Sequence, residues 1–353
     1  MRYLVLFILS LIVFESHSQE IEGFRDDIRG SGSIRVAFWN LENLFFPMDD
    51  SLTNDDSFTP YGNNHWTFTK YNDKLQKLGK AITSIGGWEA VEIIGFCEVE
   101  DRIVLQDLIN KTGLKNSNYE IVHQNSPDRR GIDVALIYRK DKVKVYNQRY
   151  IKVDFGPGSR PTRDVLQISA TLENNDTIHV LYNHWPSKYG GALATVPKRA
   201  RAAQVVKEAC DSIFSLSPNA NIILMGDFND TPIDASVKDV LHALPDTNNT
   251  STKSLINLTW PLVGNDGTHK YQGEWSVIDQ VIVSKNLYSS SSKTQLYDYN
   301  AHIFKAPFLL ESDDSHMGTK PFRTYIGMKH HGGYSDHLPI YLDLRLHTKV
   351  DNP

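Results

Sequence analysis

An acidic side chain and an amide follow one short apolar run of this sequence, at the point where the run ends. Asp227 and Asn229 come after four apolar residues and a glycine, a pattern that predicts a buried strand with both side chains at the edge of a sheet. A second cluster, Asp336 and His337, precedes another apolar run near the C-terminus. Carboxylate, amide and imidazole groups at a sheet edge suit metal-assisted attack of water on a phosphate ester. The sequence therefore predicts a hydrolytic site.

Polar residues recur at other predicted strands. Asn40 and Glu42 follow the first strand, Glu98 follows the second and His184 ends a later one, whereas Asp279 is predicted inside an apolar strand. A single residue of this kind is more often a helix cap, a solvated rim residue or a structural histidine. Because the ends of parallel strands meet at one edge of a sheet, the recurrence at six strands favours one shared site.

The elements that must position these residues are predicted from hydrophobic spacing and turn signals. Strands are predicted at residues 34–39, 91–96, 119–123, 132–138, 143–153, 165–172, 177–183, 222–225, 276–283 and 338–344. Helices are predicted at residues 69–85, around 104–109, at 200–214 and at 237–244, with loops at 47–66 and 289–333. Strands and helices thus intermix, and this pattern indicates one α/β unit rather than a run of βαβ repeats.

Composition limits the classes of protein to which the chain can belong. The 353 residues are 40% hydrophobic and 22% charged, which is ordinary for a globular protein, and the formal net charge is −5. A global positive charge that would attract nucleic acid is therefore absent, so such binding would need a local basic patch. Only Cys97 and Cys210 occur, which excludes a disulfide scaffold, and Cys97 is predicted to be a small buried hydrophobic residue.

The N-terminus has the features of a signal peptide. Arg2 supplies the positive charge, and residues 3–14 form an apolar stretch that is too short to span a membrane. We expect residues 1–18 to be removed and the protein to be exported, either secreted or periplasmic; the alternative is a membrane anchor. No shift in composition marks a boundary in the mature chain, so residues 19–353 are predicted to form a single domain.

Six motifs, in their order along the chain, resemble the endonuclease/exonuclease/phosphatase superfamily of DNase I-like and exonuclease III-like enzymes. The motifs are Trp39-Asn40-Leu41-Glu42, Phe96-Cys97-Glu98-Val99, Asn183-His184-Trp185, Gly226-Asp227-Phe228-Asn229, Ile278-Asp279 and Ser335-Asp336-His337. They span nearly the whole mature chain, and residues 321–325 and 332–335 are similar to secreted bacterial members. The resemblance implies an α/β (α+β) fold of the DNase I-like type, a two-sheet four-layer sandwich with helices outside. It also implies hydrolysis of phosphodiesters or phosphomonoesters.

The resemblance implies a metal site as well. Glu98 would be the main ligand, with Asn40, Glu42 and Asp336 near it. Hard oxygen ligands with few protein contacts suit Mg²⁺, which keeps several of its waters, and Mn²⁺ or Ca²⁺ are the alternatives.

Catalytic roles follow from the same resemblance. His337 would lie beside the scissile phosphate, and Asp279 would orient it and raise its pKa, which favours the charged form. Asp227 would orient or deprotonate the attacking water, Asn229 would bond a phosphate oxygen, and His184 would donate to the phosphate. Whether Asp227 or His337 takes the proton of the water stays open.

Substrate contacts are predicted for Lys188, Arg130, Arg163 and Tyr271. Lys188 is favoured because it closely follows the predicted histidine of the site, and Tyr271 belongs to a segment that resembles a substrate loop of the superfamily. The alternatives are that the basic residues are solvated and that the tyrosine is a packing aromatic. The wider set of basic candidates consists of Arg129, Arg160, Lys198, Arg199 and Arg201.

We expect a secreted, metal-dependent nuclease that hydrolyses phosphodiester bonds of DNA or RNA and acts as a monomer, without a stable protein partner or a membrane partner. A phosphatase or a sphingomyelinase-like phospholipid phosphodiesterase is the alternative within the superfamily. Residues 275–280 differ from the inositol-phosphate phosphatase pattern, and Val99 stands where DNase I-like nucleases often place an arginine that grips DNA. A catalytically silent surface-binding protein is an alternative from another class, and the complete set of catalytic residues disfavours it.

Overall fold

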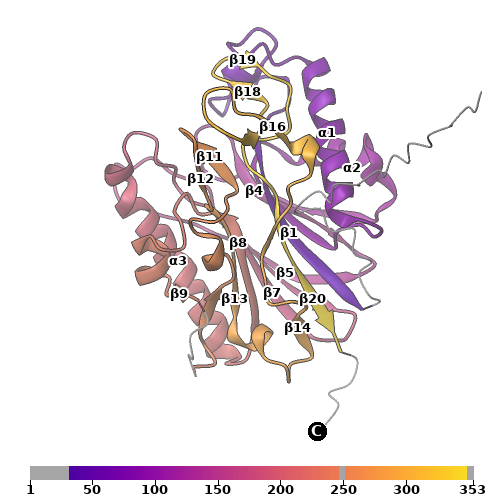
Figure 1. The fold of residues 1–353 in the computed structure, drawn as a ribbon, viewed down its shortest axis with the longest axis vertical. Coiled ribbons are helices and arrows are strands. Elements are labelled where there is room, and N and C mark those ends of the chain that lie inside the picture. Colours follow the sequence, from indigo (N-terminus) through magenta and orange to yellow (C-terminus); the bar gives the residue numbers. More distant parts are fainter. Residues whose placement is uncertain (1–31, 246–250, 348–353) are drawn as a thin grey trace, which may run out of the picture.

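Two sheets of seven strands each form the centre of the computed structural model, which describes residues 32–245 and 251–347 (Figure 1). The first sheet has the order β14 (Thr294–Leu296), β20 (Ile340–Leu346), β1 (Ser33–Leu44), β2 (Ile93–Val99), β4 (Asp133–Arg139) and β3 (Tyr119–Val122), and β15 (His302–Ile303) pairs with β20. The second has the order β5 (Val143–Ile151), β6 (Val165–Leu172), β7 (Thr177–His184), β8 (Asn221–Asp227), β13 (Asp279–Ser284), β10 (Leu255–Asn257) and β9 (Ala243–Leu244). The predicted signal peptide, residues 1–18, lies outside the described residues.

Helices and short hairpins surround the two sheets. The longer helices are α1 (Phe68–Gly86), α2 (Arg102–Asn110) and α3 (Ala192–Leu216). The short helical turns are η1 (Asp56–Phe58), η2 (Gly113–Asn116), η3 (Ser236–Val240), η4 (Trp260–Leu262), η5 (Lys285–Tyr288) and η6 (Pro307–Leu309). The hairpins are β11 (His269–Tyr271) with β12 (Glu274–Ser276), β16 (Leu310–Ser312) with β17 (Thr319–Pro321), and β18 (Tyr325–Ile326) with β19 (Lys329–His330). Among the described residues, the helices are all too short or too polar to cross a membrane.

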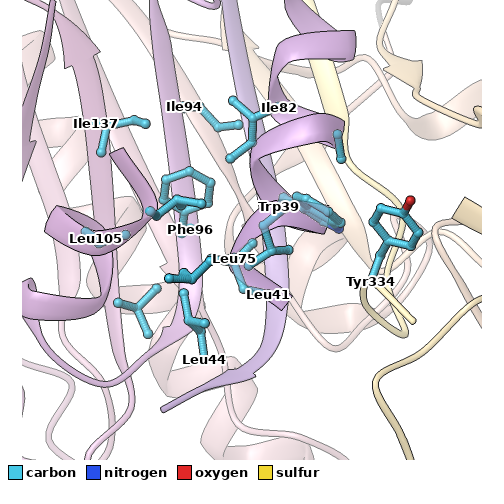
Figure 2. Packing of buried hydrophobic residues seen from close by; sticks show 14 of the residues in the cluster. Trp39, Leu41, Leu44, Leu75, Ile82, Ile94, Phe96, Leu105, Ile137 and Tyr334 are labelled. Carbon is cyan, nitrogen blue, oxygen red and sulfur yellow. The ribbon is translucent and has the colours of Figure 1, made fainter. Parts of the chain in front are cut away.

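Alternating side chains on the strands build three apolar layers. Along β1, Val36 and Phe38 face the second sheet, whereas Trp39 and Leu41 face α1 and α2. Figure 2 shows this outer layer, in which Leu75 of α1 lies beside Trp39. The third layer lies between α3 and the outer face of the second sheet. The four-layer sandwich implied by the resemblance is therefore confirmed, with helices on both outer sides (Figure 1).

The structure corrects several predicted elements. Helix α3 begins at Ala192 instead of residue 200 and includes Pro197, and the Arg199 guanidinium donates to the Ala192 carbonyl of its first turn at 3.3 Å. The predicted strand at 276–283 is divided, so Asp279 begins β13 and does not lie inside a strand. The predicted helix at 237–244 is one turn, η3, because the residues after it pair as β9 with β10. The predicted loop at 289–333 contains short paired strands.

Candidate active site

Strand alternation brings four predicted residues to one place between the sheets. Asn40 continues the inward-facing positions of β1, and Asp227 continues those of β8. His184, at the end of β7, pairs in register with Asp227, and Asp279, at the start of β13, pairs with Asp227 from the other side. Asn40, His184 and Asp227 thus line one cavity, and Asp279 lies directly behind its wall.

Glu98 reaches the same cavity by a different route. Strand alternation alone would point this side chain at the helices, since Phe96 of β2 lies in that layer. Glu98 instead has a left-handed φ of +59°, and the β1–β2 and β2–β4 pairings both shift register near the strand end. Its Oε2 accepts the Asn43 N–H at 2.9 Å, and the side chain lines the cavity. Such backbone conformations cost about 1–3 kcal/mol and cluster at functional sites.

His337 is held in one orientation by groups on both sides. Its Nδ1 lies 2.7 Å from Asp279 Oδ2, and its backbone carbonyl accepts the Trp39 indole N–H at 2.8 Å. Burial by itself lowers the pKa of His337, but the carboxylates of Asp279 and Asp227 outweigh burial and raise the pKa well above its usual value. The imidazole is therefore positively charged at neutral pH.

Asp227 lies between the two histidines. Its Oδ1 accepts the Asn229 N–H at 2.9 Å, and its Oδ2 accepts the Asn40 side-chain amide at 3.2 Å. The same Oδ2 lies 3.6 Å from His184 Nε2 and 3.9 Å from His337 Nε2. Burial raises the pKa of Asp227 to about 7, although the charge of His337 opposes this shift. A carboxyl group with a pKa near neutral is well matched to accept a proton from water.

His184 is neutral, in contrast to His337. Burial, together with the positive charges of Arg163 and Arg130, lowers the pKa of His184 well below its usual value. Its Nε2 lies 3.9 Å from Glu98 Oε1, while its Nδ1 is buried without a hydrogen-bond partner among the described residues. The two histidines therefore differ in charge although they face the same carboxylate.

The cavity has a volume of about 860 Å³ and collects most of the predicted site. Its wall includes the predicted residues Asn40, Glu98, Arg130, Arg163, His184, Asp227, Asn229, Asp336 and His337. Two of these side chains already form hydrogen bonds within the protein. Arg163 donates to the Trp185 carbonyl at 2.7 Å and to Asp128 at 3.2 Å, and the Asn229 amide donates to the Trp185 carbonyl at 3.0 Å. These contacts fix both groups at the wall, and the Asn229 amide keeps a second N–H for a ligand.

Glu42 lies outside the cavity wall. Its carboxylate accepts the backbone N–H groups of Thr324 at 2.5 Å and Tyr325 at 3.1 Å, and its carbonyl accepts the buried ammonium of Lys74 at 2.6 Å. Burial and the nearby Asp336 carboxylate raise the pKa of Glu42 to about 7. This geometry makes Glu42 an anchor for the segment around Thr324 and does not favour a direct metal contact.

Lys188 and Tyr271 also lie away from the cavity wall. The Lys188 ammonium is 3.4 Å from Asp230 Oδ1, so it faces an acidic partner. Tyr271 is 67% exposed at the end of β11. Neither residue is among those that line the cavity.

The structure adds Arg323 and His269 to the site. Arg323 lines the cavity and donates to Asp336 Oδ2 at 3.0 Å. The His269 and His337 rings lie 4.8 Å apart, and burial lowers the pKa of His269 to about 4. Arg323 belongs to residues 321–325, whose similarity to secreted bacterial members is the signal that could have found it, although the segment is polar and has no periodicity. His269 belongs to the segment that resembles a substrate loop, and this resemblance is the signal that could have found it.

The residues present fit a divalent cation with a preference for oxygen. Glu98 and Asp336 present carboxylates at the cavity wall, and Asn40 adds an amide. Although burial opposes it, the charges of His337 and Arg323 lower the pKa of Asp336, which therefore stays ionised. Hard carboxylate and amide oxygens are the ligands that Mg²⁺ prefers. Glu98, Asp336 and Asn40 are thus the candidate metal ligands.

Comparison with known proteins gives a family match. The sequence matches the family model described as Endonuclease/Exonuclease/phosphatase family over residues 35–346. No protein with a curated description matches the chain. Humanized TDP2 of D. rerio has a similar structure, with a TM-score of 0.55 and 16% identity over 89% of this chain and 100% of that chain.

Two further solved structures show the same fold. D. rerio TDP2 complexed with a single-strand DNA product has a TM-score of 0.53 and 15% identity over 89% of this chain and 99% of that chain. A mannosyl-6-phosphatase of Bacteroides thetaiotaomicron has a TM-score of 0.55 and 14% identity over 88% of this chain and 99% of that chain. At such identities these likenesses show the fold alone.

Proposed function

Because the chain belongs to the Endonuclease/Exonuclease/phosphatase family, we propose that it is a metal-dependent phosphodiesterase that hydrolyses nucleic acid. The observation that carries the proposal is a concentration of basic side chains around the Asp227–His337 pair. The basic residues at the cavity wall are Arg129, Arg130, Arg160, Arg163, Lys198 and Arg323. This is the local patch that a chain with a net charge of −5 needs in order to bind a polyanion.

The charge states of His337 and Asp227 favour a different catalytic role for each group. His337 is charged and held by Asp279, so it donates to a phosphate oxygen and carries no free lone pair for a proton. Asp227 has a pKa of about 7, so it is the proton acceptor for the attacking water. Asn229 and the neutral His184 supply further hydrogen bonds at the same wall. A divalent ion held by Glu98, Asp336 and Asn40 would polarise the phosphoryl group when bound.

Aromatic side chains at the same cavity support a nucleic-acid substrate over a small phosphoester. Phe155 and Tyr189 both line it, and Tyr189 is 94% exposed, so its ring is free to stack on a base. Hydrolysis of a phosphomonoester is the second candidate, since the mannosyl-6-phosphatase is as similar in structure as the TDP2 variant. We further propose that residues 1–18 direct export, which places the activity on extracellular or periplasmic substrates.

Activity assays of the chain from Gln19 onward would test the proposal. This chain would be assayed on single-stranded DNA, plasmid DNA, RNA, a chromogenic phosphodiester, a phosphomonoester and sphingomyelin, with Mg²⁺, with Mn²⁺ or with chelator. Glu98→Gln removes a candidate metal ligand, and Glu120→Gln is the matched control because Glu120 is exposed on β3. We expect cation-dependent nucleic-acid cleavage that falls at least about a hundredfold in Glu98→Gln and persists in the control.

Other outcomes would assign the protein to a different functional class. Cleavage of the monoester alone would move the chain to the phosphatases, and cleavage of sphingomyelin alone would move it to the phospholipid phosphodiesterases. Activity that survives the chelator would contradict the metal requirement. A folded protein that cleaves none of the substrates would be a surface-binding protein built on this fold.

A further inference from the structure

Three buried side chains of mixed chemistry, two of them from the cavity wall, converge at the candidate active site. They are Cys97 on β2, His184 at the end of β7 and Asp227 at the end of β8. A thiol sulfur, an imidazole nitrogen and a carboxylate oxygen, one from each, all lie within 4.8 Å of one another. The side chains come from both sheets and are exposed by only 0%, 5% and 2%, respectively. This donor set differs in kind from the oxygen ligands Glu98, Asp336 and Asn40.

The register of the paired strands brings these three groups together. Cys97 occupies an inward-facing position of β2 and pairs in register with Asn40, whose amide donates to Asp227. His184 and Asp227 are register partners, with His184 Nε2 3.6 Å from Asp227 Oδ2. Two ligands on a tetrahedral zinc ion are separated by about 3.4 Å, given bond lengths of about 2.0–2.2 Å. The 3.6 Å spacing of His184 and Asp227 is close to that value, and the Cys97 sulfur lies within 4.8 Å of a ligand atom of each.

His184 is also free to serve as a ligand. Its Nδ1 is buried and has no hydrogen-bond partner within the described part of the chain, so no protein group fixes the position of the ring's proton. The Nδ1 atom can therefore carry the proton, which leaves the Nε2 lone pair, on the side that faces Asp227, available to a metal ion as a neutral ligand.

We propose that Cys97, His184 and Asp227 form an inhibitory site for Zn²⁺ and for similar thiophilic ions such as Cd²⁺. Thiolate and imidazole ligands select these ions, whereas Mg²⁺ prefers oxygen, so the site and the candidate magnesium ligands discriminate between metals. On binding, the Cys97 thiol releases its proton to water and forms a metal–sulfur bond, and no oxidant is involved. The ion occupies His184 and Asp227, and hydrolysis stops whichever phosphoester is the substrate.

The two cysteines of the chain allow a matched test. Cys210 is also buried, but it lies on α3 in the outer layer of the second sheet. Wild type, Cys97→Ser and Cys210→Ser would each be titrated with Cd²⁺ while the ultraviolet charge-transfer absorption of cadmium thiolate is recorded. We expect the band in wild type and in Cys210→Ser but not in Cys97→Ser. The Zn²⁺ concentration that halves the activity should rise at least about tenfold in Cys97→Ser alone.

Several results would overturn the inference. They are a cadmium band that persists in Cys97→Ser, a band that is lost in Cys210→Ser, and zinc inhibition of Cys97→Ser at the wild-type concentration. Cys97→Ala, checked for folding by its melting temperature, replaces the serine variant if that variant does not fold. The absorption measurement needs no substrate, so it decides on the metal site even if the protein does not cleave nucleic acid.

Discussion

At the scale of single residues, the charge of His337 is the property on which the proposed chemistry depends most. Burial opposes that charge, and the charge persists because Asp279 and Asp227 face the ring. Burial lowers the pKa of His184, which faces the same Asp227, and the nearby Arg163 and Arg130 lower it further, so His184 is neutral. Burial thus disfavours the charged form of both histidines, and neighbouring carboxylates outweigh it only at His337.

Asp279→Asn should lower kcat by about a hundredfold to ten-thousandfold, because it removes the group that orients and charges His337. Asp279 raises the pKa of His337, so its removal lowers that pKa, and His337 then loses its proton at a lower pH. The alkaline limb of the pH–rate profile should therefore move to lower pH. Asp133→Asn is the control, since Asp133 holds His123 at 2.9 Å in a buried pair elsewhere. A profile that shifts equally in both variants would contradict the assignment.

At the scale of elements, the segment between β16 and β20 completes the cavity. It carries Arg323 to the wall beside Asp336, and Glu42 secures it by accepting two of its backbone N–H groups. The buried Lys74 of α1 adds bonds to the Glu42 carbonyl and to Thr324 Oγ1. Groups from β1 and α1 thus position Arg323, a cavity-lining residue, on a distant segment.

Arg323→Ala should raise KM for nucleic acid by about tenfold, because a charge-assisted hydrogen bond to a phosphate is worth about 1.5–3 kcal/mol. The effect on kcat should be smaller, since Arg323 lies at the wall beside Asp336 and not between the reacting groups. Lys320→Ala is the control because Lys320 belongs to β17 of the same segment and pairs with Glu311 at 3.9 Å. Steady-state kinetics on single-stranded DNA would measure KM and kcat of both variants. An unchanged KM in Arg323→Ala would remove this residue from the substrate site.

Glu42→Gln should lower the free energy of unfolding by about 1–3 kcal/mol, because an amide cannot accept both buried N–H groups of Thr324 and Tyr325. The Mg²⁺ concentration needed for half-maximal activity should stay near the wild-type value, whereas Glu98→Gln should raise it at least about tenfold. Urea unfolding and Mg²⁺ titrations would separate the two effects. An equal change in the Mg²⁺ requirement in both variants would make Glu42 a metal ligand, as the resemblance implies.

At the scale of the whole molecule, the site depends on how the two sheets meet. Glu98 and Asn40 come from the first sheet, and His184 and Asp227 come from the second. Tyr182 of β7 crosses the interface between the sheets and donates to the Ala37 carbonyl at 3.0 Å. A Cβ atom at Gly95 of β2 would lie 2.2 Å from the Tyr182 ring, so glycine is required there for the sheets to approach.

Gly95→Ala should destabilise the protein by about 1–3 kcal/mol, because overpacking at a rigid interface forces the backbone or the ring to move. Activity should fall as well, since the change separates the sheets that share the site. Gly113→Ala is the control, because its added Cβ would meet only Thr83 at 3.7 Å, and its effect should lie within about 0.5 kcal/mol. Urea unfolding would compare the two variants, and equal stabilities would show that the sheets do not interlock at this point.

Much of the fold and part of the site can be predicted from local sequence patterns. Apolar spacing predicts α1 and most of the strands, and the order of the six motifs implies the two-sheet fold, which the structure confirms. Asn40, His184 and Asp227 end their strands on inward-facing positions, so alternation carries them to the same cavity. The division of the strand before Asp279 was not predicted, because Val277 and Ile278 are as apolar as strand residues.

By itself, the sequence determined the class of fold and the identity of the polar residues at the strand ends, because both follow from local apolar spacing and motif order. Only the tertiary structure decided that Glu98 turns into the cavity, that Glu42 anchors a segment, and that Arg323 reaches the wall. It also decided which histidine is charged and which thiol lies beside the Asp227 carboxylate. One physical reason is that the left-handed backbone conformation of Glu98 redirects its side chain at the strand end. The other is that the charge of a histidine depends on neighbours that are remote in sequence.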